Sequence, residues 1–230
     1  AQLIIADIPY NIGTNAYGSR SDWYIDGDNK NGESNKAGKT FFDTDDDFKI
    51  YNFFQFCVRL LKKEPKETGK APCMIIFCSW QQLNEIREYA KGFGFKHAQP
   101  LFFIKKTSSQ VLKANMRVCG ATETAIVLYR DKLPKFNNNG RMILDWFEWD
   151  RGGNYPKIHP TQKPVTLLKQ LIQIYTDIGD VVIDPVAGSG STLRACAELN
   201  RSCYGFEIKK EFYNKSKKLM LSDVNLALEI

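Results

Sequence analysis

Short apolar runs alternate with longer stretches of helical spacing along most of the chain. The apolar runs carry β-branched or aromatic residues and end at turn-forming residues, which is typical of buried strands. They predict strands at residues 3–6, 73–79, 101–105, 124–129, 181–184 and 202–206. Apolar positions at helical spacing predict helices at residues 47–62, 81–91, 164–175, 191–199 and 209–221. This alternation favours an α/β fold in which helices cover a mostly parallel sheet.

Two long segments interrupt the alternation. Residues 11–46 are rich in Gly, Asn and Asp, whereas a compact α/β fold joins its elements by a handful of residues. We interpret residues 11–46 as a mobile functional loop. Residues 131–158 hold Trp146, Phe147 and Trp149 without a regular period. This second segment fits either a small insertion that meets a partner or aromatic packing onto the main core.

The composition fits one large folded domain or a domain with a small insertion. The 230 residues are 43% hydrophobic, which is enough for a sizeable core and excludes a disordered chain. Lys and Arg number 32 against 26 Asp and Glu, and the net charge of +6 suits a polyanionic partner, although many unrelated proteins share it. No apolar stretch approaches the roughly 20 residues of a membrane span.

The cysteines form neither a metal-binding nor a disulfide pattern. The six have no CxxC pair, and only two histidines accompany them. We therefore expect reduced thiols, no metal and an intracellular protein. The chain starts at Ala1, without a methionine and almost inside the first predicted strand, so we expect a short native N-terminal segment that is missing or was not numbered. Its first residues show no basic region followed by an apolar one.

Two polar turns carry candidate chemistry. The first, residues 7–10, ends the first predicted strand and is by itself equally typical of a turn, because Asp and Pro both favour strand exits. The second, residues 184–192, joins a predicted strand to a predicted helix. The first turn is made of Asp7, Ile8, Pro9 and Tyr10. The second is made of Asp184, Pro185, Val186, Ala187, Gly188, Ser189, Gly190, Ser191 and Thr192.

The second turn has the form of a nucleotide-type site. Its two glycines permit close backbone approach, and Ser191 and Thr192 can open a helix whose first N–H groups are unsatisfied. The next predicted strand leads to Glu207, roughly 20 residues beyond Asp184, where an acidic side chain meets ribose hydroxyls in nucleotide-binding folds. Strand, glycine turn, helix, strand and terminal acid in this order predict a site for an adenosyl cofactor.

These segments resemble motifs of the β-class DNA amino-methyltransferases, which use S-adenosyl-L-methionine. Residues 7–10 resemble the DPPY motif and residues 184–192 the DPFxGSGT motif, in the circularly permuted order of that class. HPTQKP at residues 159–164 is similar to an element that precedes the cofactor strand, and residues 122–128 are similar, more weakly, to the TE/HE-plus-strand signature. The resemblance implies one Rossmann-like methyltransferase domain over residues 1–230, with a seven-stranded, mostly parallel sheet and helices on both faces.

The resemblance also assigns roles to the first turn. Asp7 would accept one N–H bond of the target amine and the Ile8 carbonyl the other, so that the lone pair of the nitrogen points at the methyl group. Pro9 presets the turn, and Tyr10 would stack on the base swung out of double-stranded DNA. Ile8 departs from the proline of the family: its carbonyl survives, but the turn loses rigidity. Asp in the first position resembles the adenine-N6 group, whereas Ser is commoner among cytosine-N4 enzymes.

Cofactor contacts are implied for a larger set. The implied residues are Asp7, His159, Thr161, Gln162, Lys163, Asp184, Pro185, Ala187, Gly188, Ser189, Gly190, Ser191, Thr192, Phe206 and Glu207. Lys163 suits the cofactor carboxylate, Glu207 the ribose and Phe206 the adenine ring. Without the resemblance, residues 159–164 are equally typical of a solvated loop before a helix. Phe206 by itself is typical of core packing.

Target recognition falls on residues 107–122 and 131–158, with residues 11–46 closing over the flipped base. None of these segments matches a groove-reading motif. Their small size is typical of short target sites, of weak binding as a monomer, or of work as a homodimer or with a partner subunit. The resemblance implies a cytoplasmic, bacterial or phage-encoded protein of a restriction-modification system, with DNA and S-adenosylmethionine as partners and no membrane.

Other functions remain open. A cytosine-N4 methyltransferase and a non-catalytic cofactor- or DNA-binding subunit both fit the motifs, the latter because of Ile8. A methyltransferase for RNA or protein glutamine would carry Asn-Pro-Pro-Tyr after its cofactor loop, which is the opposite order. A dinucleotide oxidoreductase would have its glycine fingerprint in the first βα turn.

Overall fold

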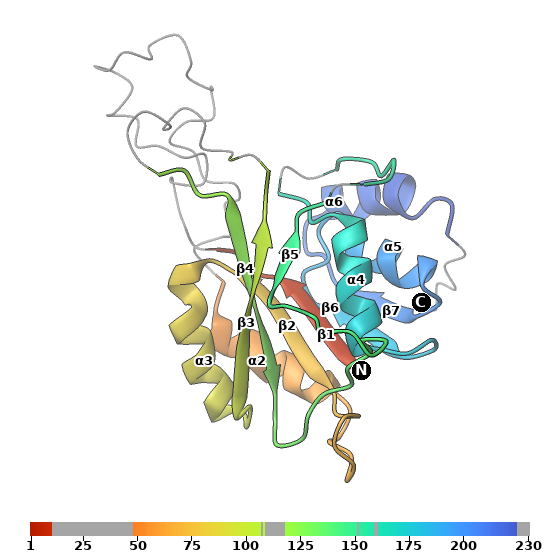
Figure 1. The fold of residues 1–230 in the computed structure, drawn as a ribbon. Coiled ribbons are helices and arrows are strands. Elements are labelled where there is room, and N and C mark those ends of the chain that lie inside the picture. Colours follow the sequence, from red (N-terminus) through yellow and green to blue (C-terminus); the bar gives the residue numbers. More distant parts are fainter. Residues whose placement is uncertain (11–47, 107, 109–117, 151, 159–160, 225–230) are drawn as a thin grey trace.

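The computed structural model describes residues 1–10, 48–106, 108, 118–150, 152–158 and 161–224. Within these residues a seven-stranded sheet has the order β5-β3-β4-β2-β1-β6-β7 (Figure 1). Its strands are β1 (Leu3–Asp7), β2 (Cys73–Cys78), β3 (His97–Ile104), β4 (Thr122–Tyr129), β5 (Trp146–Glu148), β6 (Val181–Asp184) and β7 (Ser202–Gly205). Strand β4 is antiparallel to both neighbours, and all other pairs are parallel. The predicted, mostly parallel sheet is confirmed.

Helices cover both faces of the sheet (Figure 1). They are α2 (Ile50–Leu60), α3 (Leu83–Gly92) after the 3-10 turn η2 (Trp80–Gln82), α4 (Val165–Tyr175), α5 (Ser191–Glu198) and α6 (Lys210–Lys215), which continues into the π turn η4 (Ser216–Met220). Alternate residues of β1 explain the two layers: Leu3 and Ile5 pack with α4 and α5, whereas Ile4 and Ala6 pack with α2 and α3. A strand buried on both faces is apolar throughout, as this one is.

Two elements differ from the sequence prediction. Strand β3 begins at His97, before the expected residue 101, because its first residues pair with β4 while their side chains stay exposed and show no apolar run. Pro100 is tolerated there since β5 pairs only with Phe102 to Ile104, which leaves the start of β3 at the sheet edge. Strand β5 itself was not predicted, because three residues carry too weak a pattern.

The ends of the strands divide the sheet into two edges. The parallel strands β1, β2, β6 and β7 all finish at one edge, which we call the carboxyl edge, and the antiparallel β4 begins there. In open α/β sheets, ligands bind at this edge. The opposite, amino edge lies where β1, β2 and β6 begin.

The segment of residues 131–158 contacts both the amino edge and the carboxyl edge of the sheet. At the amino edge, Lys135 N donates to the Ala71 carbonyl at 3.1 Å, and Asn137 N donates to the Ile174 carbonyl at 2.7 Å. At the carboxyl edge, Trp149 N donates to the Ile104 carbonyl at 2.8 Å. Only the later part of this segment therefore lies beside the strand ends that carry the sequence motifs.

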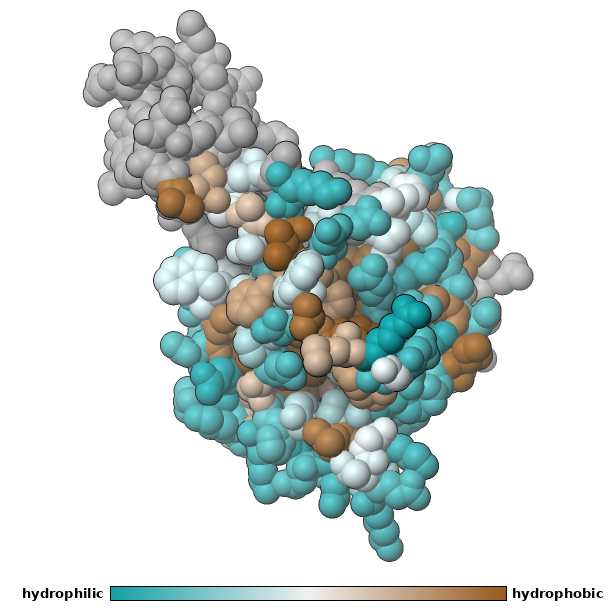
Figure 2. Space-filling view, in the orientation of Figure 1, coloured by the Kyte–Doolittle hydropathy of each residue, from teal (hydrophilic) through white to brown (hydrophobic). Residues whose placement is uncertain are grey.

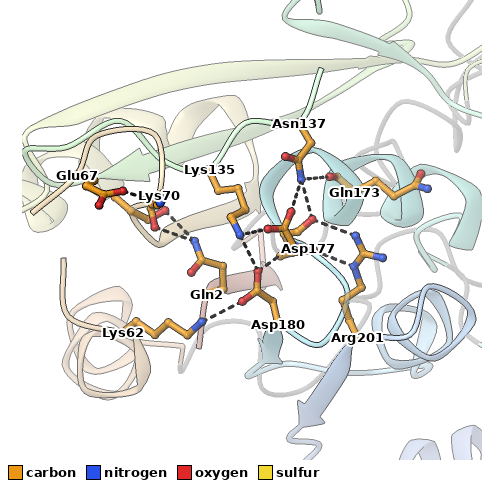
Figure 3. Close-up of polar contacts among 12 residues, drawn as sticks. Gln2, Lys62, Glu67, Lys70, Lys135, Asn137, Gln173, Asp177, Asp180 and Arg201 are labelled. Atoms are coloured by element: carbon orange, nitrogen blue, oxygen red, sulfur yellow. Dashed lines mark hydrogen bonds and ion pairs between the residues drawn. The ribbon is translucent and has the colours of Figure 1, made fainter. Parts of the chain in front are cut away.

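A partly exposed polar cluster fixes the earlier part of the segment (Figure 3). We call it the amino-edge cluster: Lys62, Lys135, Asn137, Asp177 and Asp180. Lys135 pairs with both aspartates, and Lys62 Nζ lies 2.9 Å from Asp180 Oδ1. The face of the molecule seen in Figure 2 is mostly hydrophilic, with apolar residues gathered in its middle.

Candidate active site

The first motif turns off the carboxyl end of β1, between β2 and β6. Ile8 N donates to the Phe77 carbonyl at 3.2 Å, which carries the pairing with β2 one residue past the strand. Ile8 as a whole is 2% exposed, and its side chain packs in the core beneath α2. The side chain that replaces the family's proline therefore fills the core.

A buried lysine joins the first motif to two other segments. Lys163 is 5% exposed, and its Nζ lies 2.6 Å from Asp7 Oδ1 and 3.0 Å from Glu123 Oε2. Glu123 also pairs with Lys105 and accepts the Tyr10 hydroxyl at 3.2 Å. These five residues form the carboxyl-edge cluster. Two lysines balance two carboxylates, as burial of charge requires.

The charges of the cluster set its protonation. Burial raises the pKa of Asp7, and the nearby Lys163 ammonium opposes that rise. Burial alone would raise the pKa of Glu123, but Lys163 and Lys105 hold it below its usual value. Burial would likewise lower the pKa of Lys163, and the two carboxylates raise it instead. Burial, with the carboxylates of Asp7 and Glu123, raises the pKa of Tyr10 well above its usual value, so Tyr10 is a neutral phenol.

The two oxygens of Asp7 differ in their surroundings. Oδ1 is buried and lies 2.6 Å from the Lys163 ammonium. The Asp7 side chain as a whole is 30% exposed, so part of the carboxylate beyond the buried Oδ1 remains accessible. A carboxylate oxygen has more than one acceptor position, so a carboxylate held by a lysine can also accept a donor from a ligand.

The second motif follows β6 as predicted. Asp184 is 4% exposed, and its Oδ1 accepts Val186 N at 3.0 Å. Burial raises its pKa to about 7, against hydrogen bonds from Thr192 and Val186. Gly190, with φ +76°, occupies the left-handed region, and an added Cβ would lie 3.1 Å from Ser216 Cβ. Glycine is therefore required here both by backbone conformation and by the close approach of η4.

The acid after β7 is brought to this loop. Glu207 Oε2 accepts Gly188 N at 2.8 Å and Oε1 accepts Lys209 N at 2.7 Å. Phe206 joins the same place through its backbone, since its carbonyl accepts Ala187 N at 2.8 Å. Its ring is 47% exposed and packs edge-on against Phe56 at 5.4 Å, so the alternative of core packing is wrong.

The remaining predicted cofactor residues lie in two places, the glycine loop that leads into α5 and the loop before α4. Ser189, Ser191 and Thr192 are buried, and the Ser189 and Ser191 hydroxyl oxygens lie 2.9 Å apart, so these side chains support the loop from within. Gln162 bridges its own loop, accepting Ile158 N and donating to the Pro156 carbonyl, both at 3.0 Å. Thr161 and Pro185 are partly exposed in the same two loops. His159 lies outside the described residues, as do residues 11–46 and most of 107–122.

The sequence motifs assigned Lys163 to cofactor binding and gave no catalytic role to Glu123, Lys105 or Trp149. In the structure the Lys163 ammonium contacts the carboxylates of Asp7 and Glu123. Lys105 Nζ lies 4.6 Å from the Trp149 ring centroid, which closes this side of the cluster. The weak TE signature was the only signal for Glu123, because its pairing depends on antiparallel β4.

The arrangement fits a cofactor that combines positive charge with hydroxyl groups. Three neighbouring strands, β1, β6 and β7, end in or just before Asp7, Asp184 and Glu207. Their carboxylates line up beside a glycine loop that allows backbone approach. Among the described residues, no group of three or more His, Cys, Asp and Glu forms a metal site, and none of the helices there is long and apolar enough to cross a membrane.

Comparisons with known proteins agree with this geometry. A family model described as DNA methylase matches residues 1–218. The DNA adenine methyltransferase YhdJ of Escherichia coli K12 is 26% identical over 237 residues, covering 91% of this chain and 72% of YhdJ. The type II methyltransferase M.HindIII of Haemophilus influenzae is 48% identical over 161 residues, which cover 64% of this chain and 50% of M.HindIII.

Solved structures share the fold. The M1.HpyAVI complex with SAM has a TM-score of 0.65 at 23% identity, covering 94% of this chain and 87% of that one. The PvuII DNA methyltransferase, described as cytosine-N4-specific, has a TM-score of 0.68 at 15% identity, covering 99% of this chain and 80% of that one. The predicted fold class is thereby confirmed.

Proposed function

Because the chain belongs to the DNA methylase family, whose members transfer methyl groups from S-adenosylmethionine to DNA, we propose that it methylates adenine N6 of a flipped-out base in double-stranded DNA. Membership of the family confirms the resemblance found in the sequence motifs. The observation that carries the proposal is the Asp7 carboxylate, which Lys163 holds through the buried Oδ1 while the side chain stays 30% exposed, next to the Ile8 carbonyl.

The target amine needs two acceptors. Its lone pair is delocalised into the base, so the nitrogen is a poor nucleophile until acceptors on its N–H bonds favour a pyramidal geometry. The Asp7 carboxylate and the Ile8 carbonyl supply this pair in the proposal. Acceptors that are already fixed in place stabilise the developing charge without reorganisation.

The rest of the carboxyl-edge cluster keeps these groups ready. Lys163 offsets the burial of Asp7 and holds it in place as a carboxylate, which accepts hydrogen bonds and does not donate them. Glu123 accepts the Tyr10 hydroxyl and so fixes the ring of Tyr10 at the site. In the proposal, this ring stacks on the flipped base and replaces part of the lost base stacking.

The cofactor belongs beside the second motif. When bound, S-adenosylmethionine supplies a methyl group activated by its positive sulfur. Asp184 and Asp7 would offset its positive charge, Glu207 would accept ribose hydroxyls, and Phe206 would flank the adenine ring. Gly188 gives backbone access at the same loop. Both oxygens of Glu207 keep free lone pairs, since each accepts one backbone N–H in this structure.

Adenine is the proposed base because Asp occupies the first motif position and because YhdJ is a DNA adenine methyltransferase. Cytosine N4 is the second candidate, favoured by the fold shared with the cytosine-N4-specific PvuII enzyme. Both amines are exocyclic and need the same two acceptors. We propose that residues 107–122 and the part of residues 131–158 at the carboxyl edge contact the DNA.

The test is transfer of a labelled methyl group from S-adenosylmethionine to double-stranded DNA. We expect transfer by the wild type and a loss of about 100- to 1000-fold in Asp7→Ala, by the scale of lost transition-state contacts, with the cooperative unfolding transition kept. Base analysis of the product distinguishes N6-methyladenine from N4-methylcytosine. Cofactor binding without transfer to any DNA would instead favour the non-catalytic subunit.

A further inference from the structure

A short turn after β2 is hydrogen-bonded to the backbone of the first motif. Ser79 directly follows the strand and caps η2, which places Gln82 three residues later; both residues are buried, at 7% and 5% exposure. Gln82 Nε2 donates to the Pro9 carbonyl at 2.9 Å. Ser79 Oγ lies within hydrogen-bond distance of the Tyr10 carbonyl, at 3.3 Å. Neither residue belongs to a motif noted in the sequence.

The contacts of Gln82 require an amide. Its Oε1 accepts Ser79 N at 3.0 Å, while its Nε2 faces a carbonyl that can only accept. A carboxylate could not donate to Pro9, and an apolar side chain could make neither bond. Ser79 Oγ is also 3.1 Å from Gln82 Oε1, so its single proton serves either the amide or the Tyr10 carbonyl.

These bonds leave one carbonyl of the motif free. The carbonyls of Pro9 and Tyr10 already have donors, whereas no described residue donates to the carbonyl of Ile8. On the other side, Ile8 N is held by the Phe77 carbonyl. The peptide around the Ile8 carbonyl is therefore held from both directions, while the carbonyl itself accepts no hydrogen bond from the described residues.

We infer that Gln82, supported by Ser79, is a positioning residue that aims the Ile8 carbonyl at the target amine. The inference rests on the proposed methyl transfer. It also accounts for Ile8: the rigidity that a proline would give to this peptide is supplied by a hydrogen bond from the neighbouring turn. Misplacing a reacting group by about 1 Å can cost about 100-fold in rate, so a loose carbonyl would be costly.

The test compares Gln82→Met with Gln81→Met, since Gln81 lies exposed in the same turn. We expect the single-turnover rate at saturating DNA and cofactor to fall about 10- to 100-fold in Gln82→Met and to change less than about twofold in Gln81→Met. Cofactor Kd should stay within about threefold in both variants, by the same positioning argument. An unchanged rate in folded Gln82→Met would overturn the inference.

A second variant separates positioning from general support of the fold. In Gln82→Glu the new carboxyl group donates to the Pro9 carbonyl only when protonated. Its rate relative to wild type should therefore rise as the pH falls, whereas the relative rate of Gln82→Met and of the control Gln81→Glu should not. A flat relative profile for Gln82→Glu would contradict the role given to this bond.

A readout without activity keeps the inference distinct from the proposed function. Protein labelled with ¹³C at the Pro9 carbonyl should show a shifted resonance in Gln82→Met but not in Gln81→Met. A shift together with an inactive wild type would refute the methyl transfer and leave the clamp intact. An unmoved Pro9 resonance would refute the clamp, whatever the activity.

Discussion

Each edge of the sheet holds a lysine between two carboxylates, and the two clusters differ in how deeply the lysine is buried and in how many groups hold the carboxylates. In the carboxyl-edge cluster Lys163 is 5% exposed, and its ammonium lies 2.6 Å from the buried Oδ1 of Asp7. In the amino-edge cluster Lys135 is 19% exposed, and Asp177 and Asp180 accept several hydrogen bonds (Figure 3). The amino-edge cluster stabilises the fold by linking segments of the chain, whereas the carboxyl-edge cluster keeps the Asp7 carboxylate as a hydrogen-bond acceptor for a ligand.

The pKa values of the acids follow the same division. Hydrogen bonds from Lys135 and Asn137 hold the pKa of Asp177 below its usual value. Burial would raise the pKa of Asp180, but the Asp177 backbone N–H and Lys62 lower it. At the carboxyl edge, burial prevails for Asp7 and Asp184 and raises the pKa of both, whereas Lys163 and Lys105 hold the pKa of Glu123 below its usual value. Such raised values are typical of functional sites.

Among the variants that compare the two edges, Lys163→Met has the largest expected effect. Removing this ammonium leaves Asp7 and Glu123 buried without its charge, so we expect the free energy of unfolding at pH 8 to fall by about 3 kcal/mol. The methyl-transfer rate should fall by more than about 100-fold, because Asp7 loses both position and charge. Urea unfolding and single-turnover rates measure the two effects.

The matched control is Lys135→Met at the amino edge. Lys135 itself is more exposed than Lys163, and Asp177 and Asp180 keep other donors, so the free energy of unfolding should fall by about 1 kcal/mol or less, with the rate within about twofold of wild type. Equal losses of rate in the two lysine variants would contradict the proposal that only the carboxyl-edge cluster acts in methyl transfer.

The second largest effect is expected in the pH dependence of stability, which should differ between an aspartate of the carboxyl edge and one of the amino edge. The pKa of Asp184 is about 7 in the folded protein and 3.8 when unperturbed, so the folded state binds more protons between these values. Its contribution to stability is then largest below about pH 4 and falls as the pH rises to 7. Urea unfolding from pH 4 to 8 should show Asp184→Asn gaining stability relative to wild type as the pH rises.

Asp180→Asn provides the opposite sign. The pKa of Asp180 is lowered in the folded protein, so its stabilising contribution is present above about pH 4 and is lost as the pH falls further. The difference in stability between wild type and this variant should therefore shrink on acidification. A parallel pH course for the two aspartate variants would refute the assignment of their environments.

The sequence predicts those parts of the site that local signals encode. Asp7 and the glycine loop stand at strand ends, where polar turn residues interrupt apolar runs, and the structure places both at one edge. The partnership of Lys163 with Glu123 could not be predicted, because it depends on β4 running antiparallel and on burial of a lysine from a loop. Nor does local pattern show that the Ile8 side chain fills the core.

The smallest effect is expected from Asn137→Ala, which tests whether the two halves of residues 131–158 are functionally separate. The Asn137 amide donates to the carbonyls of Gln173 and Thr176 and to Asp177. Its loss should lower the free energy of unfolding by about 1 kcal/mol, the net value of exposed hydrogen bonds. Sequencing of methylated sites should find the same target as for wild type, because this half lies at the amino edge. A changed target would mean that residues near Asn137 reach the DNA, and the amino edge would then take part in recognition as well as in holding the chain.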